Sequence, residues 1–331
     1  MKKILLLQTG GTISMDESRK LHQLDRSGWS RILDKQIPEI NSLADIEVEH
    51  LFAEDSSDLN RQHWKIIAEA VEQNYADFDG FVILHGTDTM AYTASALSFC
   101  LQHLDKPVIL TGSQVPLANI RSDARRNLVN AIEIATMSLC EVMICFNDHV
   151  FRGNRTTKMS IGDFDAFASP NYPPLAEIGL NIELRDTFLA GTTQSFETYP
   201  EFSDRILLLK SHPNLNTSYL RPDWGSLRAI VLEAFGSGNF PLKDQQGIWP
   251  LLKKGFDRET LIIITSQAPY DSVDLTKYES GRRALDKGAI GAGDMTVEAT
   301  VTKLMYLLGR YKDNSDVRNQ FQQPIAGEIT V

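Results

Sequence analysis

The chain has 331 residues, a formal net charge of −10 and an isoelectric point near 5.2. Its length exceeds the usual size of a single hydrophobic core and predicts two domains. The acidic balance argues against a binding surface for nucleic acid or anionic membranes, which requires clustered Lys and Arg. No apolar run approaches a membrane span, and the N-terminal apolar run is too short for a signal peptide. With three cysteines in mostly apolar surroundings, we expect a cytoplasmic protein with reduced thiols.

An apolar run at residues 4–7 breaks into the motif TGGTI at 9–13. Such a run followed by glycines predicts a buried strand that ends in a tight turn. Thr12 would then lie just beyond the carboxyl end of a strand, where open α/β sheets bind their ligands. The same arrangement recurs where the run at 81–84 meets the motif HGTDTM at 85–90. Two strand ends therefore each present a threonine.

Apolar runs and helical periodicity alternate along the chain, which predicts βαβ units and a doubly wound, mostly parallel sheet in a larger N-terminal domain. The same alternation resumes after residue 205 and predicts a smaller C-terminal α/β domain. We predict a catalytic domain over 1–187, a linker over 188–204 and a second domain over 205–331. The expected strands lie at 46–52, 80–84, 107–111, 141–146, 206–210, 229–232 and 261–265, and the expected helices at 61–75, 90–104, 122–138 and 296–310.

Two local features of the N-terminal half have alternative interpretations. The polar segment 14–27 could close over a site, or it could be a solvated connector. Asp58, or a serine beside it, could simply cap the helix that begins near residue 61.

A threonine hydroxyl is a weak nucleophile and needs a neighbouring base to take its proton. A lysine beside a carboxylate can serve, and Asp88 follows Thr87 directly. Lys158 is the best candidate lysine, because it lies in a polar segment soon after the fifth predicted strand. Spacing alone favours a surface lysine at this position.

A small zwitterion such as an amino acid needs acceptors for its ammonium group and donors for its carboxylate. Asp55, Ser56 and Asp88 supply carboxylates and a hydroxyl for both, and backbone N–H groups at the glycines can stabilise an oxyanion. His85 could act as a general base, but a histidine at a strand end is more often a structural hydrogen-bonding group. No Cys or His pair has metal-ligand spacing and no glycine turn ends in a Walker Lys-Ser, so we expect no metal and no cofactor.

Together these motifs resemble the bacterial L-asparaginase family, in particular its cytoplasmic type I branch. The resemblance covers nearly the whole chain. It rests on TGGTI at 9–13, DSSD at 55–58, HGTDTM at 85–90, GSQVPL at 112–117, RGNRTTK at 152–158, DAFASP at 165–170, GSGN at 236–239 and GDMTVEAT at 293–300.

The resemblance implies an amidohydrolase that converts the side-chain amide of L-asparagine to L-aspartate and ammonia. It implies Thr12 as primary nucleophile and a second triad of Thr87, Lys158 and Asp88. It also implies that the substrate's α-groups are held at a site that includes Asn239 contributed by a partner subunit of a homodimer or homotetramer. The other implied binding residues are Asp55, Ser56, Asp88 and, beside them, Ser57.

The chain departs from the family pattern at two places. Family enzymes carry a tyrosine in the loop after the first threonine, whereas the first tyrosine here is Tyr75; His22 lies near the equivalent spacing. The arginine and cysteine of an allosteric asparagine site align with Glu233 and Ala268, which argues against allosteric activation although Thr157 is present.

Three further functions stay open at this point. Glutamine differs from asparagine by one methylene, which a pocket discriminates by only about 1–3 kcal/mol. A tRNA-dependent amidotransferase is less favoured, because that relative carries an additional N-terminal domain. A non-catalytic amino-acid-binding protein would explain the missing tyrosine. The sequence also leaves open whether Thr12 forms an acyl-enzyme or water attacks directly with Thr87 and Lys158 as base.

Overall fold

The computed structural model describes residues 1–14, 33, 35–189, 191 and 193–330. The chain divides into two compact units, Met1–Pro200 and Glu201–Val331, which are described separately below. Within the described residues, no helix combines the length and the apolar character needed to cross a membrane.

The first unit is built on an eight-stranded sheet with the order β11-β10-β7-β6-β5-β3-β1-β2. The five strands from β6 to β2 are parallel, and β7, β10 and β11 extend the sheet in antiparallel fashion. The predicted mostly parallel sheet is therefore confirmed. The strands are β1 Lys3–Gly10, β2 Asp45–Glu54, β3 Gly80–Leu84, β5 Val108–Thr111, β6 Val142–Phe146, β7 His149–Arg152, β10 Ala176–Ile178 and β11 Ile182–Leu184.

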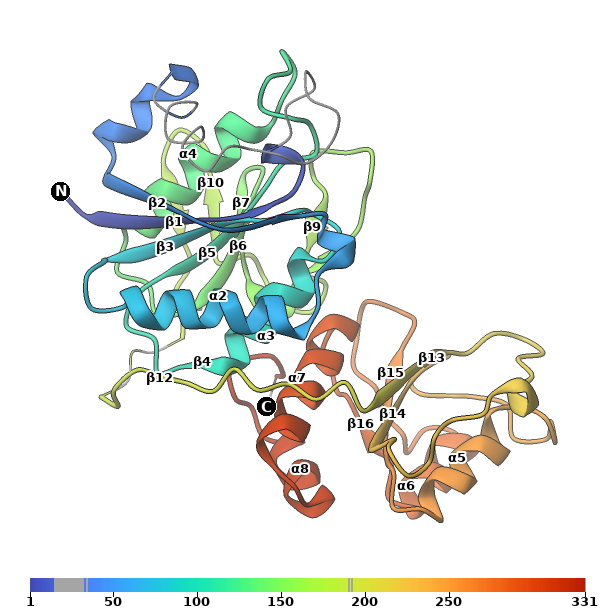
Figure 1. The fold of residues 1–331 in the computed structure, drawn as a ribbon. Coiled ribbons are helices and arrows are strands. Elements are labelled where there is room, and N and C mark those ends of the chain that lie inside the picture. Colours follow the sequence, from blue (N-terminus) through green and yellow to red (C-terminus); the bar gives the residue numbers. More distant parts are fainter. Residues whose placement is uncertain (15–32, 34, 190, 192, 331) are drawn as a thin grey trace. The chain divides into compact units, whose positions relative to one another are not determined.

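Helices cover both faces of this sheet, with α2 (Arg61–Asn74) and α3 (Met90–Cys100) on one face and α4 (Ala124–Ala135) on the other (Figure 1). Alternate residues of the parallel strands, such as Leu6, Val82 and Ile109, form a core with α4. Every residue of α3 except Tyr92 is buried, which explains its lack of an amphipathic pattern. Short 3₁₀ turns follow two strand ends, η1 at Thr12–Ser14 and η3 at Ser56–Asp58, and η2 spans Pro38–Ser42.

Two expectations about helix ends are wrong. Asn60, not Asp58 or a serine, caps α2: its side chain accepts the N–H of Gln62, and the His63 ring accepts the N–H of Asn60. The helix expected over 90–104 ends at Cys100, because the backbone turns extended at Leu101 and left-handed at His103, with φ 59°.

Part of the predicted linker is attached to the first unit. Strand β12 (Glu197–Thr198) pairs with β4 (Leu101–Gln102), and the Phe196 ring stacks on Tyr75 with the centroids 3.7 Å apart. These contacts hold the end of the first unit against α2 and α3. The domain boundaries at 187 and 204 remain predictions.

The second unit contains a smaller parallel sheet of order β13-β14-β15-β16, formed by Ile206–Lys210, Ala229–Ala234, Leu261–Ser266 and Ile290–Gly291. The smaller α/β unit agrees with expectation. Its core packs Ile230, Leu232, Ile262 and Ile264 against the helices that follow β14 and β15. The helices are α5 Ile248–Phe256, α6 Glu279–Asp286, α7 Val297–Arg310 and α8 Asn314–Phe321, with a 3₁₀ turn, η5, at Thr217–Tyr219.

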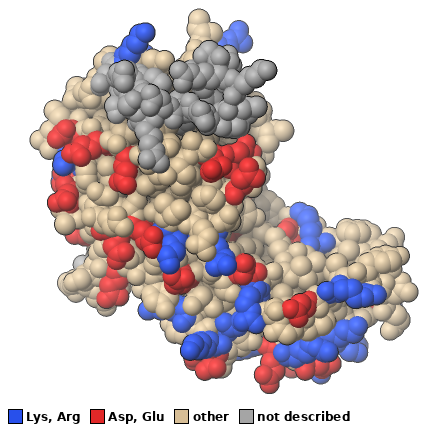
Figure 2. All heavy atoms as spheres, in the orientation of Figure 1, with Lys and Arg blue, Asp and Glu red and all other residues tan. Residues whose placement is uncertain are grey.

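Charge is unevenly distributed on the visible face of the molecule. Acidic side chains predominate on the first unit, whereas Lys and Arg side chains gather on the second (Figure 2). The net charge of −10 therefore does not describe every local surface.

Candidate active site

The carboxyl ends of β1 and β3 lie side by side in the sheet. The chain leaves β1 for β2 on one flank and then returns to β3 on the other, so this is the point where the strand order reverses. Open α/β sheets bind ligands at such a point. The buried Thr9 hydroxyl donates a hydrogen bond to the Leu84 carbonyl at 2.7 Å and fixes the two ends relative to each other.

Glycine is required where the turn after β1 approaches its neighbours. Gly10 and Gly11 have φ of 118° and 81°, in the left-handed region that side chains disfavour. A Cβ on Gly11 would lie 2.4 Å from the Gly86 nitrogen, and one on Gly10 would lie 2.3 Å from the Glu54 carbonyl. The turn therefore places half-buried Thr12 next to the turn that carries Thr87.

Three predicted catalytic side chains meet beyond β3. The Lys158 ammonium donates to the Thr87 hydroxyl oxygen at 2.7 Å and to the Asp88 carboxylate at 2.6 Å. Thr87 is buried, and the side chain of Lys158 is 15% exposed against 63% for Asp88. A hydroxyl, an amine and a carboxylate in mutual contact form a relay that can pass a proton.

A short hairpin brings Lys158 to this point from far along the chain. Strand β8 (Thr157–Lys158) pairs with β9 (Phe167–Ala168), with Lys158 opposite Phe167. The preceding η4 turn (Gly153–Arg155) is buried beside α3: a Cβ on Gly153 would lie 3.0 Å from that of Ala94. The buried turn and the hairpin give Lys158 a fixed position.

Gln114 belongs to the site although its side chain was not predicted there. Its amide nitrogen donates to the Ser160 and Asp163 carbonyls at 3.4 and 3.2 Å, and its amide oxygen accepts from the Thr87 hydroxyl at 3.1 Å. Carbonyls only accept hydrogen bonds, so the amide oxygen must face Thr87 and Thr87 must donate. Lys158 is then the donor to Thr87.

The loop that carries Gln114 is anchored by α4. The Gln114 backbone N–H donates to both carboxylate oxygens of Asp123, at 3.1 and 3.0 Å. Asn127 donates to the Gly112 carbonyl and to Asp123, each at 2.9 Å. These hydrogen bonds fix the position of Gln114 relative to the strand ends.

The predicted substrate-binding residues follow β2. Asp55 caps η3, where one carboxylate oxygen accepts from the N–H and the hydroxyl of Ser57, each at 2.8 Å. Ser56 is 4% exposed and lies against the second turn, since a Cβ on Gly86 would be 2.7 Å from its hydroxyl oxygen. Its carbonyl accepts from Thr89 at 2.7 Å, which ties η3 to the start of α3.

His85 is fully buried beneath the turn. Its Nδ1 contacts the Gly86 carbonyl at 2.7 Å, so Nδ1 must carry a proton, and its Nε2 accepts from the Thr93 hydroxyl at 2.8 Å. The Trp64 indole N–H donates to Thr93 at 3.1 Å. Burial lowers the pKa of His85 to about 4, with the Gly86 carbonyl acting in the opposite direction. This geometry fits the structural interpretation of His85.

Two further residues named from the sequence belong to other parts of the chain. Asn239 lies in the second unit, where its side-chain oxygen accepts from Ser280 at 2.6 Å. His22 lies outside the described residues. Within the ranges that are described, no group of three or more His, Cys, Asp or Glu side chains could hold a metal ion.

Residues 3–189 match the family described as Asparaginase, N-terminal, and residues 205–321 match the Glutaminase/Asparaginase C-terminal domain. The chain belongs to the asparaginase family. It is 40% identical to L-asparaginase 1 of Escherichia coli strain K12, in an alignment that covers 99% of this chain and 98% of that protein. The resemblance to the type I branch is thereby confirmed.

Asparaginases also have the same fold. The solved structure of the thermostable L-asparaginase from Thermococcus kodakarensis matches with a TM-score of 0.90 and 36% identity, covering 99% of each chain. A relative with a different name, a glutamyl-tRNA(Gln) amidotransferase polypeptide of Thermococcus kodakarensis, is 34% identical over 100% of this chain and 77% of its own length. This asparaginase-family chain is thus an enzyme related to amidohydrolases.

Proposed function

We propose that the protein is an L-asparaginase that hydrolyses the side-chain amide of L-asparagine to L-aspartate and ammonia, without metal or cofactor. The observation that carries this proposal is the contact of Lys158 with both Thr87 and Asp88, at 2.7 and 2.6 Å. The similarity to proteins named L-asparaginase supports the choice of substrate.

In the proposed reaction, the Thr12 hydroxyl oxygen attacks the amide carbon, its proton passes to the departing nitrogen, and ammonia leaves. Water then attacks the resulting ester, with Thr87 and Lys158 taking its proton, and releases aspartate and the free hydroxyl. Splitting one difficult hydrolysis into two steps is the usual advantage of a covalent intermediate. The glycine turns support this role, because they hold Thr12 beside the turn that carries Thr87.

The peptide between Gly86 and Thr87 offers a donor for the developing oxyanion. The His85 ring holds the Gly86 carbonyl on the buried side. In a trans peptide the next N–H points the opposite way, so the N–H of Thr87 faces away from His85. We assign to it the stabilisation of the negative oxygen in the transition state.

We assign the substrate's α-amino and α-carboxylate groups to the η3 turn and Asp88. Asp55 and Asp88 supply carboxylates for the ammonium group, and the Ser56 hydroxyl supplies a donor for the carboxylate, with Ser57 beside them. Asn239 of a second copy would complete the site, which requires a homodimer or a homotetramer. We also place the protein in the cytoplasm, which agrees with three cysteines that form no disulfide.

Two alternatives are tested by the same assay. Hydrolysis of glutamine as well as asparagine would make the enzyme a broader amidohydrolase. The absence of a tyrosine before Tyr75 favours a protein that binds asparagine without turnover.

The decisive experiment measures ammonia release by the purified full-length protein with L-asparagine, L-glutamine and D-asparagine. We expect turnover of L-asparagine, and a loss of several orders of magnitude in Thr12→Ala with the fold intact by circular dichroism. Mass spectrometry of protein quenched during turnover should detect an adduct of Thr12. If calorimetry detects binding of asparagine but no ammonia is released, the proposed enzymatic activity is refuted and the protein is a non-catalytic asparagine-binding protein.

A further inference from the structure

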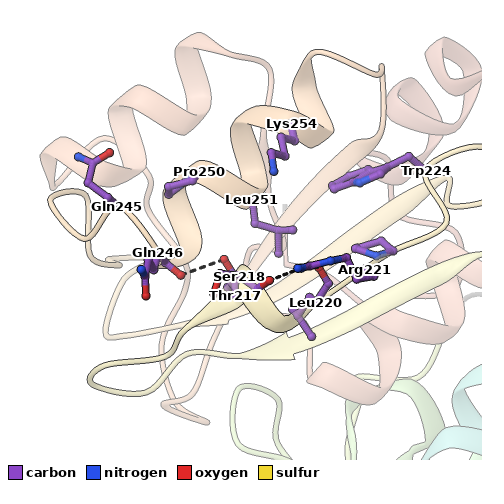
Figure 3. A pocket seen from close by; sticks show the side chains of 11 residues that line it. Thr217, Ser218, Leu220, Arg221, Trp224, Gln245, Gln246, Pro250, Leu251 and Lys254 are labelled. Atoms are coloured by element: carbon purple, nitrogen blue, oxygen red, sulfur yellow. Dashed lines mark hydrogen bonds between the residues drawn. The ribbon is translucent and has the colours of Figure 1, made fainter.

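The second unit contains a hollow of about 410 Å³ between the segment 217–224 and helix α5 (Figure 3). This volume lies within the range of small-molecule sites in proteins. None of the residues predicted for catalysis or asparagine binding lines it. Its lining consists of Thr217, Ser218, Leu220, Arg221, Pro222, Trp224, Gln245, Gln246, Pro250, Leu251 and Lys254.

Hydrogen bonds tie the two walls of the hollow together. Buried Thr217 donates its backbone N–H to the Gln246 carbonyl at 2.7 Å and its hydroxyl to the Gly247 carbonyl at 2.7 Å. Asn216 donates to the Gln246 side-chain oxygen at 2.7 Å, and its own oxygen accepts the Ser218 N–H at 2.9 Å. The hollow is therefore a preformed feature of the fold and not a gap between independent loops.

The charged groups that line the hollow are both cations. Figure 3 shows Lys254 projecting from α5 and Arg221 lying along the facing segment. The Arg221 guanidinium donates to the Ser218 carbonyl and to the Leu220 carbonyl, the latter at 3.0 Å, which fixes its plane. A guanidinium carries five N–H donors in a rigid fork, so this anchoring leaves others to meet an oxyanion.

Two carboxylates close to the lining residues in sequence accept hydrogen bonds from their own turns. Asp223 accepts from the Gly225 N–H at 3.1 Å and from the Ser226 hydroxyl at 2.5 Å, and Asp244 accepts from the Gln246 N–H at 2.9 Å. Two cations therefore face the hollow while neighbouring acids are directed to their own turns.

Part of the remaining lining is apolar. Leu220, Leu251 and the two prolines form apolar walls, and the Trp224 indole forms one end. Arg258 lies over the Trp224 ring, 5.6 Å from its centroid, and holds the indole in place. An indole with a fixed plane suits the stacking of a flat apolar group.

We propose that this hollow binds a small organic anion: a carboxylate or phosphate between Arg221 and Lys254, with a flat apolar body against Trp224. All of its lining residues belong to the second unit, and its binding does not depend on asparagine hydrolysis. Amide groups of Gln245 and Gln246 add donors at the rim.

Isothermal titration calorimetry on the full chain tests this with phenyl phosphate, phenylacetate, neutral phenylacetamide and inorganic phosphate. We expect saturable binding of at least one aromatic anion below about 10 mM, and binding of the neutral amide at least about tenfold weaker. The preferred aromatic anion identifies phosphate or carboxylate as the group recognised. Phosphate alone should bind more weakly than phenyl phosphate, because it lacks the apolar body.

Variants assign the binding to this hollow. The double variant Arg221→Gln/Lys254→Gln should weaken binding at least about tenfold, whereas Lys253→Gln, one position earlier on α5 and outside the lining, should not. We expect binding next to Trp224 to change the tryptophan fluorescence emission. Trp224→Phe should abolish this change, while calorimetry still detects binding. The proposal is overturned if no anionic probe saturates, if the neutral amide binds as well, or if the double variant binds like the unaltered chain.

Discussion

Two lysine–carboxylate pairs of nearly equal length occupy opposite environments in this molecule. In the first unit, Lys158 lies 2.6 Å from Asp88, with side chains 15% and 63% exposed. In the second unit, Lys303 lies 2.5 Å from Glu328, and both are fully buried. Distance alone does not distinguish them, but their other partners do.

Among the described residues, the other hydrogen-bond partners of the buried pair are backbone carbonyls and N–H groups, which do not exchange protons with it. Lys303 also donates to the Phe321 and Gln323 carbonyls, at 2.8 and 2.7 Å, and Glu328 accepts the N–H groups of Ile325 and Ala326. All three ammonium protons are thereby engaged. Burial lowers the pKa of Lys303, and Glu328 acts in the opposite direction. This pair fixes the C-terminal segment against α7.

The exposed pair differs in one partner, the Thr87 hydroxyl, which can both donate and accept. Its proton can turn from Gln114 to Lys158 when the lysine is neutral, and the carboxylate of Asp88 remains to hold the resulting ammonium. We infer the proposed role of Lys158 from the hydroxyl it contacts and not from the strength of its ion pair.

The largest expected effect is on turnover by Lys158→Met. Loss of the base should lower kcat for asparagine by about 10³-fold or more, within the range of general base catalysis. The free energy of unfolding should change less than for a fully buried pair, because Asp88, left without its cation, is 63% exposed and stays solvated. Steady-state ammonia release and urea unfolding measure the two quantities. Lys65→Met, which removes a surface pair with Glu69, is the control; equal rates in both variants would refute the role of Lys158.

The converse effect is expected for Lys303→Met. Leaving Glu328 buried without its cation should cost about 3–5 kcal/mol in the free energy of unfolding, with kcat of the folded protein unchanged. Urea unfolding followed by circular dichroism measures it. Arg283→Met, which removes the exposed pair with Glu279, should cost less than about 1 kcal/mol. Adding Glu328→Gln to Lys303→Met should recover part of the stability, and no recovery would contradict the unpaired charge as the cause.

Most of the parallel strands were predictable because their runs are bounded by glycine, proline and polar residues, whereas the two-residue parallel strand β16 was missed. Strands β3 and β13 coincide with the ranges expected from sequence, 80–84 and 206–210. Strands β7, β10 and β11 and the β8–β9 hairpin were missed. Each has only two to four residues and depends on partners distant in sequence, so local periodicity carries no signal for it.

The site divides in the same way. Thr12, Thr87 and Asp55 each follow a predicted strand. Because the carboxyl ends of parallel strands lie at the same end of a sheet, their proximity could be inferred from the sequence. Gln114 also follows a strand, and that was the available signal. Its role depends on carbonyls of the hairpin that carries Lys158, which only the tertiary structure brings within reach.

A smaller effect on kcat is expected for Gln114→Leu, which removes the hydrogen-bond acceptor of Thr87. The Thr87 hydroxyl loses its fixed acceptor, so its oxygen no longer faces Lys158 in one orientation. We expect kcat to fall about tenfold, which corresponds to the loss of one hydrogen bond of about 1.4 kcal/mol. KM should change less than about threefold. Ser122→Ala removes a bond to the Val115 carbonyl in the same loop without reaching Thr87, and should leave kcat within about twofold. A parallel loss in both variants would show that only loop order matters.

The last expected effect concerns His85, a fully buried titratable group whose pKa is shifted by burial and by no charged side chain among the described residues. Because burial lowers its pKa from 6.5 to about 4, the unfolded chain binds a proton that the folded protein excludes. Stability should therefore fall as pH drops from 6.5 towards 4, by about 1 kcal/mol at pH 6 and at most about 1.4 kcal/mol per pH unit.

Urea unfolding at several pH values between 7 and 4.5 gives the free energy of unfolding as a function of pH. The contribution of His85 is the difference in the slope of this pH dependence between the unaltered chain and His85→Asn. The asparagine amide can still donate to the Gly86 carbonyl but does not titrate, so its profile should be flatter. His212→Asn removes an exposed histidine and should leave the slope unchanged. Equal slopes for all three proteins would mean that His85 takes up its proton in the folded state. The fold would then hold a protonated, fully buried His85 ring without a counter-ion, whereas the buried Lys303 ammonium has a hydrogen-bond acceptor for each of its three protons.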